Sequence, residues 1–159
     1  MRPCLVATVL VLCFAQSDAA TFGRSMFAGE PEVLTGDPAR AVFKQCSRPA
    51  PVPSQILPAP SKVELRQLEQ AVERHISFEH AARRPTPPST APYARQYVAY
   101  ELDGRRMIYG NYYPASHGAV AERSAGNAVV VCDGGAQFWG ISFDPKTRKV
   151  ESLSFNGSA

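Results

Sequence analysis

Two histidines and a glutamate lie close together in residues 75–80 of this 159-residue chain, in an arrangement that resembles a helical zinc site. A helix that binds zinc through H-E-x-x-H places its two histidines four residues apart, on one face. Here His75 and His80 are five residues apart, which rotates the second imidazole away from the first. An extra residue also interrupts the inverted motif H-x-x-E-H. We therefore predict no metal site here and no cofactor for the chain.

A second group of reactive side chains consists of Cys132, His117 and Asp133. A pair of Cys132 with His117 would suit a thiol enzyme or a small hydrolase, because a cationic neighbour lowers the pKa of a thiol. Cys132, however, follows three consecutive valines, a run typical of a core strand, and does not begin a helix. No G-x-S-x-G elbow is present either. The residues favour a non-enzymatic protein without catalytic residues, and an enzyme that uses these three side chains is the alternative.

The glycines after Asp133 raise the question of a phosphate or metal site, because glycine lets backbone N–H groups approach an anion. Gly134 and Gly135 precede another predicted strand and not a helix, so they lack the dipole and the spacing of a P-loop. We interpret Asp133-Gly134-Gly135 as a hairpin turn.

The first residues indicate export. Arg2 precedes an apolar run over residues 4–15, and small residues follow at the cleavage positions, as in a signal peptide of residues 1–19. The run is shorter than the roughly 20 residues that span a bilayer. We expect a periplasmic or secreted protein with no transmembrane segment after cleavage. A lipid anchor on Cys13 is disfavoured, because Leu12 stands where a lipobox has a small residue.

Cleavage of this leader leaves Cys46 and Cys132 as the cysteines of the mature chain. In an oxidising compartment two exported thiols most simply form one disulfide, which is our prediction. A buried free thiol at Cys132 is the alternative. Loss of Arg2 and Asp18 leaves the net charge at +3, and the basic residues are dispersed, so we expect no nucleic-acid partner.

Residues 20–60 read as a proline-rich, partly irregular arm that precedes an α+β domain of residues 61–159. Within the arm, Asp37 and Pro38 predict a short helix over residues 39–46. The main helix is predicted to begin after Ser61, which forms a capping box with Glu64, and to run to about Ala82. The prolines from Pro85 onward end it.

Strands are predicted for the rest of the chain. Residues 97–102 and 105–113 flank Asp103-Gly104, a strong hairpin signal, which pairs Tyr100 with Met107 and Val98 with Tyr109. We expect the face with these four side chains to be the core face. A second hairpin joins residues 128–132 to 138–143, and a last strand covers 150–155. The pattern predicts one main helix packed on a four-stranded antiparallel meander, an order that resembles the cystatin-like layout.

Aromatic side chains suggest where a partner binds. Trp139 is the single tryptophan, and a core position is its default interpretation. The alternative is that Trp139, Tyr97 and Tyr112 lie on the other, solvent-exposed face of the sheet. They would then form an exposed aromatic cluster, and such clusters mark contact surfaces.

Short motifs in the C-terminal third occur in a fixed order: Val130-Val131-Cys132-Asp133-Gly134-Gly135, Phe138-Trp139-Gly140, Phe143-Asp144-Pro145 and Phe155-Asn156-Gly157. This part of the chain, residues 62–159, resembles a group of small exported proteins of Gram-negative bacteria that have no assigned activity. The resemblance implies a periplasmic setting and supplies no catalytic residue. We therefore expect an exported, non-enzymatic protein that binds another envelope or secreted protein or a glycan, as an inhibitor or an immunity-type partner. A structural component of the cell envelope is a further alternative.

Overall fold

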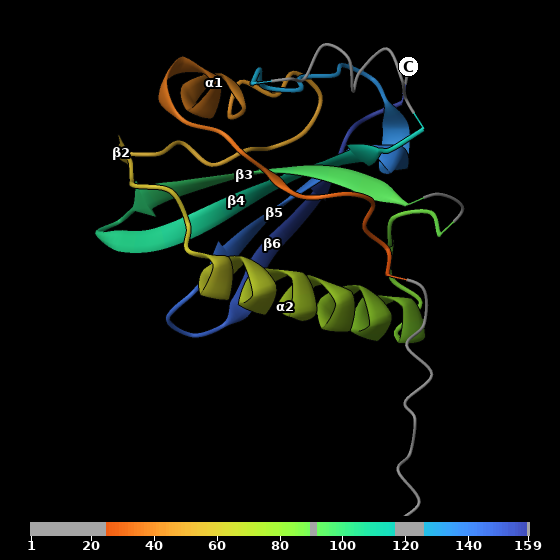
Figure 1. The fold of residues 1–159 in the computed structure, drawn as a ribbon. Coiled ribbons are helices and arrows are strands. Elements are labelled where there is room, and N and C mark those ends of the chain that lie inside the picture. The colour runs from red at the N-terminus through yellow and green to blue at the C-terminus, as the bar shows by residue number, and fades with distance from the viewer. Residues whose placement is uncertain (1–24, 90–91, 117–125, 159) are drawn as a thin grey trace, which may run out of the picture.

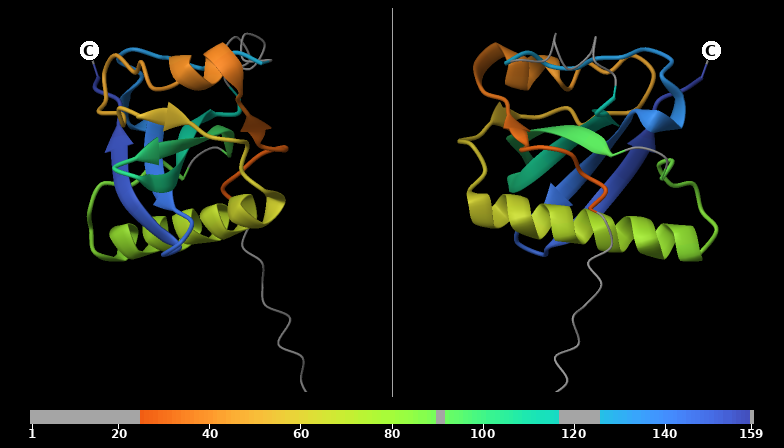
Figure 2. Two further views of the ribbon diagram at one scale, coloured as in Figure 1. Left: turned by 90° about the vertical axis from the view of Figure 1, so that its left-hand side faces the viewer. Right: turned by 45° about the vertical axis from the view of Figure 1, so that its right-hand side comes forward.

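The computed structural model describes residues 25–89, 92–116 and 126–158. It is an α+β fold in which a twisted sheet lies between two layers (Figure 1). The long helix α2 runs along one face of the sheet, and the arm with the short helix α1 lies on the other (Figure 2). The elements in chain order are β1 Glu32–Val33, α1 Gly36–Ala41, β2 Gln55–Ile56, α2 Lys62–Ala81, β3 Tyr93–Leu102, β4 Arg105–Pro114, the 3-10 helix η1 Gly135–Gln137, β5 Trp139–Asp144 and β6 Lys149–Phe155.

The sheet has six strands and is mixed, whereas the sequence predicted four antiparallel strands. Strands β3 to β6 pair antiparallel with their neighbours, and the predicted register of Tyr100 with Met107 is confirmed. The arm adds the other two strands on the outer edge of β3: β1 parallel and β2 antiparallel. An unpaired strand edge exposes N–H and C=O groups, so these short strands satisfy backbone groups that a bare meander would leave open.

Helix α2 follows the sequence prediction closely. The Ser61 hydroxyl accepts from the Glu64 N–H, and the Glu64 carboxylate accepts from the Ser61 N–H, so the capping box is present. The helix ends at Ala81, before the prolines. Leu68 and Val72 lie on its buried face and pack against the aromatic side chains of the sheet.

The aromatic cluster that was predicted to reach solvent is instead the core beneath α2. Trp139, Tyr97 and Tyr112 are each 0% exposed, so their assignment to a contact surface is wrong and the core position of Trp139 is confirmed. Tyr112 stacks on Trp139 with ring centroids 3.7 Å apart. Burial raises the pKa of the Tyr97 and Tyr112 hydroxyls well above the ordinary value. These three side chains are buried because α2 covers the face of the sheet that carries them.

The face with Val98, Tyr100, Met107 and Tyr109 is also buried, as expected, and the arm covers it. Helix α1 begins and ends earlier than the predicted helix of residues 39–46, and Thr35 stands at its N-cap. It contributes Ala39 to this second core, together with other buried or partly buried arm residues: Leu34, Val42, Phe43, Ala50 and Ile56. Each face of the sheet therefore has its own hydrophobic layer.

Residues 128–132, predicted as a strand, form no strand in the structure. The backbone groups of Val129 and Val131 bind the side chains of Gln96, Asn111 and Asn156 and not a neighbouring strand. None of the helices in residues 25–89, 92–116 and 126–158 has the length and apolar character of a membrane span. The predicted leader lies outside the described residues.

Candidate functional site

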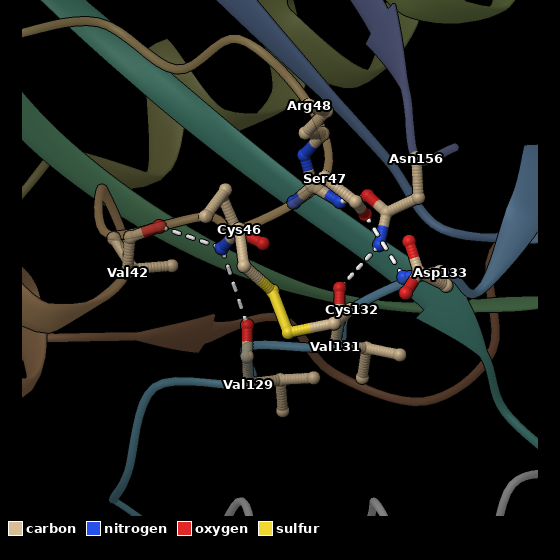
Figure 3. The surroundings of a disulfide bond; sticks show 10 residues. Val42, Cys46, Ser47, Arg48, Val129, Val131, Cys132, Asp133 and Asn156 are labelled. Atoms are coloured by element: carbon tan, nitrogen blue, oxygen red, sulfur yellow. Dashed lines mark hydrogen bonds between the residues drawn. A yellow bond between two sulfur atoms is a disulfide. The ribbon is translucent and has the colours of Figure 1, made fainter. Parts of the chain in front are cut away.

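A disulfide joins Cys46 to Cys132, as predicted, with the two Cα atoms 5.4 Å apart (Figure 3). It connects the arm to residues 126–133, the segment that precedes η1. Both cysteines are exposed to solvent. Cys132 has no free thiol in this state, so a thiol mechanism that uses Cys132 has no nucleophile, and His117 lies outside the described residues.

The Asp133-Gly134-Gly135 turn is built from two residues with positive φ, Asp133 at 57° and Gly135 at 64°. The Asp133 N–H donates to the Ser47 hydroxyl at 3.0 Å, and the Gly135 N–H donates to the Gly157 carbonyl at 2.9 Å. These donors therefore have partners within the protein and are not directed at an anion. The hairpin prediction is wrong, because residues 128–132 form no strand and Gly135 begins the 3-10 helix η1 that leads into β5.

The histidines of α2 do not converge on a metal site. His75 lies 3.8 Å from a Glu79 carboxylate oxygen, one turn along the helix. Across the described residues, no group of three or more His, Cys, Asp or Glu side chains is arranged to hold a metal ion.

A buried arginine, which the sequence did not single out, joins the arm to the sheet. Arg48 is 6% exposed, and its guanidinium donates to Asn111 Oδ1, to Asn156 Oδ1 and, at 3.3 Å, to the Tyr109 hydroxyl. Gly140 leaves space for the contact between Arg48 and Tyr109, because a Cβ at this position would lie 2.5 Å from Tyr109 Oη. Among the described residues no carboxylate lies within ion-pair distance of Arg48. A lone arginine between Ser47 and Pro49 gives no sequence signal of burial.

An open pocket lies between the end of α1 and the proline-rich part of the arm, with a volume of about 580 Å³. We call it the arm pocket. Phe43 lines it and packs on the core, with ring centroids 5.2 Å from Tyr100 and 5.0 Å from Tyr109. Val52 is 84% exposed at the rim. The full lining is Arg40, Phe43, Lys44, Pro51, Val52, Pro53, Ser54, Gln55 and Ile56.

The charged residues in the lining of the arm pocket are both cations. Arg40 forms a weak, exposed contact with Asp37 at 3.4 Å, and Lys44 has no ion pair with any described residue. Sequence reasoning missed these residues. The available signal was the run of prolines from Pro49, which indicated an extended segment on the surface.

A second, smaller pocket of about 430 Å³ lies between the two hairpin turns and the start of α2. Its charged residues are paired, except for Lys146, which has no ion pair with any described residue. Arg106 donates to Glu64 at 2.9 Å, and this hydrogen bond is the main cause that lowers the Glu64 pKa to about 2. Arg105 lies 3.5 Å from Asp144. The arm pocket is therefore the better candidate for a charged ligand.

Comparisons with protein-family models, curated proteins and solved structures found no match to this chain.

Proposed function

We propose that this chain is an exported, non-enzymatic protein that binds an envelope or secreted protein through the arm pocket. The leader pattern of residues 1–19 and the Cys46–Cys132 disulfide support export, because disulfides persist in oxidising compartments. The observation that carries the binding assignment is the arm pocket itself, an apolar surface whose charged residues are both basic.

The partner that suits this surface is an acidic segment with an apolar side chain. Val52, almost fully exposed, gains the most from losing its contact with water, and complete burial of a valine side chain contributes about 1.5–3 kcal/mol. Arg40 and Lys44 lie on the same pocket and would attract carboxylates of the partner. Phe43 gives the partner a fixed apolar contact, since its ring already packs against two core tyrosines.

Site-specific cross-linking tests the proposal. A photoreactive amino acid replaces Val52 in the arm pocket and, in a matched control, Val63 on α2, which is also exposed, at 52%. Both proteins are expressed with their own leader in the native host and irradiated in intact cells. We expect one discrete protein adduct from position 52 and none from position 63. Charge reversal of Arg40 and Lys44 to glutamate should abolish the adduct.

Two results would contradict the proposal. Adducts of equal yield and identity from positions 52 and 63 would mean that the arm pocket has no particular role. An adduct from position 52 that survives both charge reversals would remove the argument for an acidic partner.

A further inference from the structure

Residues 126–133 lie against the sheet in a way that resembles a bound peptide. The Gln96 side chain holds two residues of this segment: Gln96 Nε2 donates to the Asn127 carbonyl at 2.6 Å, and Gln96 Oε1 accepts from the Val129 N–H at 2.8 Å. Asn111 Nδ2 donates to the Val129 carbonyl at 2.9 Å. One residue of the segment is therefore held through both of its main-chain groups.

The same pattern continues toward Asp133. Asn156 Nδ2 donates to the Val131 carbonyl, and the Ser47 hydroxyl accepts from the Asp133 N–H at 3.0 Å (Figure 3). Apart from the Gly126 N–H, which donates to Glu32 Oε1 at 2.6 Å, the bound main-chain groups thus belong to residues 127, 129, 131 and 133. In an extended chain, alternate residues direct their N–H and C=O groups to the same side. We call the side chains of Gln96, Asn111 and Asn156 the amide row. The amide row therefore hydrogen-bonds to the main chain of this segment as the edge of a neighbouring strand would in a sheet.

The amide row contacts main-chain atoms, so its contacts place little demand on the sequence of the bound segment. Amide side chains supply both donors and acceptors, which suits the alternating groups of a peptide backbone. Side-chain selection comes mainly from Val129, with smaller contributions from Val131, which packs against the same cluster, and from Ala128, which packs against the core covered by the arm. Val129 is 7% exposed and packs in a small apolar cluster with Tyr113 and Phe138, whereas Val130 is 40% exposed. The ligand that fits is an extended peptide with a small apolar side chain at the position of Val129.

We propose that the amide row is a binding site for an extended peptide main chain, and that residues 126–133 are its resident occupant, held there by the Cys46–Cys132 disulfide. A dithiol that reaches this exposed bond passes two electrons and two protons to the sulfurs, which become thiols, while the dithiol becomes a disulfide. The resident segment then stays in place by its hydrogen bonds and by the packing of Val129, Val131 and Ala128.

Two synthetic peptides provide the test. Each has the sequence of residues 126–133 with serine in place of Cys132. One carries an N-methyl group at the Val129 nitrogen, whose hydrogen bonds to Gln96. The other carries it at the Val130 nitrogen, which has no hydrogen-bond partner among the described residues. The receptor is the reduced full-length protein with Val129→Asp. This substitution lowers the affinity of the resident segment, which its tether otherwise presents at an effective concentration of millimolar order.

We expect the unmodified peptide and the Val130-methylated peptide to bind this receptor equally, and the Val129-methylated peptide to bind about tenfold more weakly, as the loss of one buried hydrogen bond implies. The oxidised wild-type protein should bind none of them. Equal binding of the two methylated peptides, or no binding at millimolar peptide to a folded receptor, would overturn the proposal.

Hydrogen exchange on the wild-type protein covers the case in which the Val129→Asp variant does not fold. After reduction, the Val129 amide should exchange at least about tenfold faster, while the amides of β3 and β4 keep their protection. Unchanged exchange at Val129, or loss of protection throughout the sheet, would show that the disulfide does not hold a separable segment. The cross-linking experiment at Val52 reports on a different surface, so its outcome is independent of these results.

Discussion

Replacement of Arg48 by methionine would show how strongly the buried guanidinium holds the arm to the sheet. Arg48 is 6% exposed and donates to Asn111, Asn156 and Tyr109. Methionine keeps a long, flexible side chain and removes every donor. The amide oxygens of Asn111 and Asn156, both in buried residues, then lose their Arg48 donors.

Two effects of opposite sign decide the size of the change. Removal of a buried charge relieves a desolvation penalty of several kcal/mol. Against this, a hydrogen bond from a charged group contributes about 1.5–3 kcal/mol, and a buried acceptor left without a partner costs about 1–3 kcal/mol. Because only one member of the cluster changes, the orphaned acceptors dominate. We expect the free energy of unfolding to fall by about 3 kcal/mol.

Urea unfolding under oxidising conditions measures this change, with the fluorescence of the single, buried Trp139 as the probe. The control is Arg66→Met, at an exposed position of α2, for which the free energy of unfolding should stay within about 0.5 kcal/mol of wild type. If Arg48→Met is as stable as Arg66→Met, the desolvation penalty of the guanidinium cancels its hydrogen bonds and our reasoning is refuted.

Three further predictions use the same unfolding assay. Serine at both disulfide cysteines should lower the free energy of unfolding by about 4–5 kcal/mol, because the bond closes a loop with a sequence separation of 86; an unchanged urea midpoint would contradict this. Gly140→Ala should lose about 1–3 kcal/mol through overpacking against the Tyr109 hydroxyl, and stability equal to wild type would refute the close contact. Glu64 has a folded-state pKa of about 2 against an ordinary 4.5, so its stabilisation is complete above pH 4.5 and is lost as the pH falls toward 2. A pH series of urea midpoints should therefore fall less steeply for Glu64→Gln than for wild type, and parallel curves would count against the Arg106 contact.

Local signals in the sequence predicted the parts of the fold that depend on neighbouring residues. The capping box at Ser61 and the Asp103-Gly104 turn involve groups within a few residues of one another, and both occur in the structure as predicted. The disulfide was predicted for a different reason: cleavage of the predicted leader would leave two cysteines that have only each other as partners.

The position of the arm was not predictable in this way. β1 and β2 are two residues long, and such short segments carry no periodicity. They become strands because the outer edge of β3 needs hydrogen-bond partners. The same holds for residues 128–132, where the apolar run predicted a strand that does not form, because amide side chains of the sheet and not a neighbouring strand bind the backbone there.

The sequence by itself determined helix α2 and the β3–β4 hairpin with its register, because these depend on local backbone preferences and on hydrophobic patterning. Only the tertiary structure decided which faces are covered. Trp139, Tyr97 and Tyr112 became core because α2 packs over them, and Arg40, Lys44 and Val52 came together because the arm folds back across the sheet. Burial depends on which distant segment covers a residue, and the residue's own type does not specify that segment.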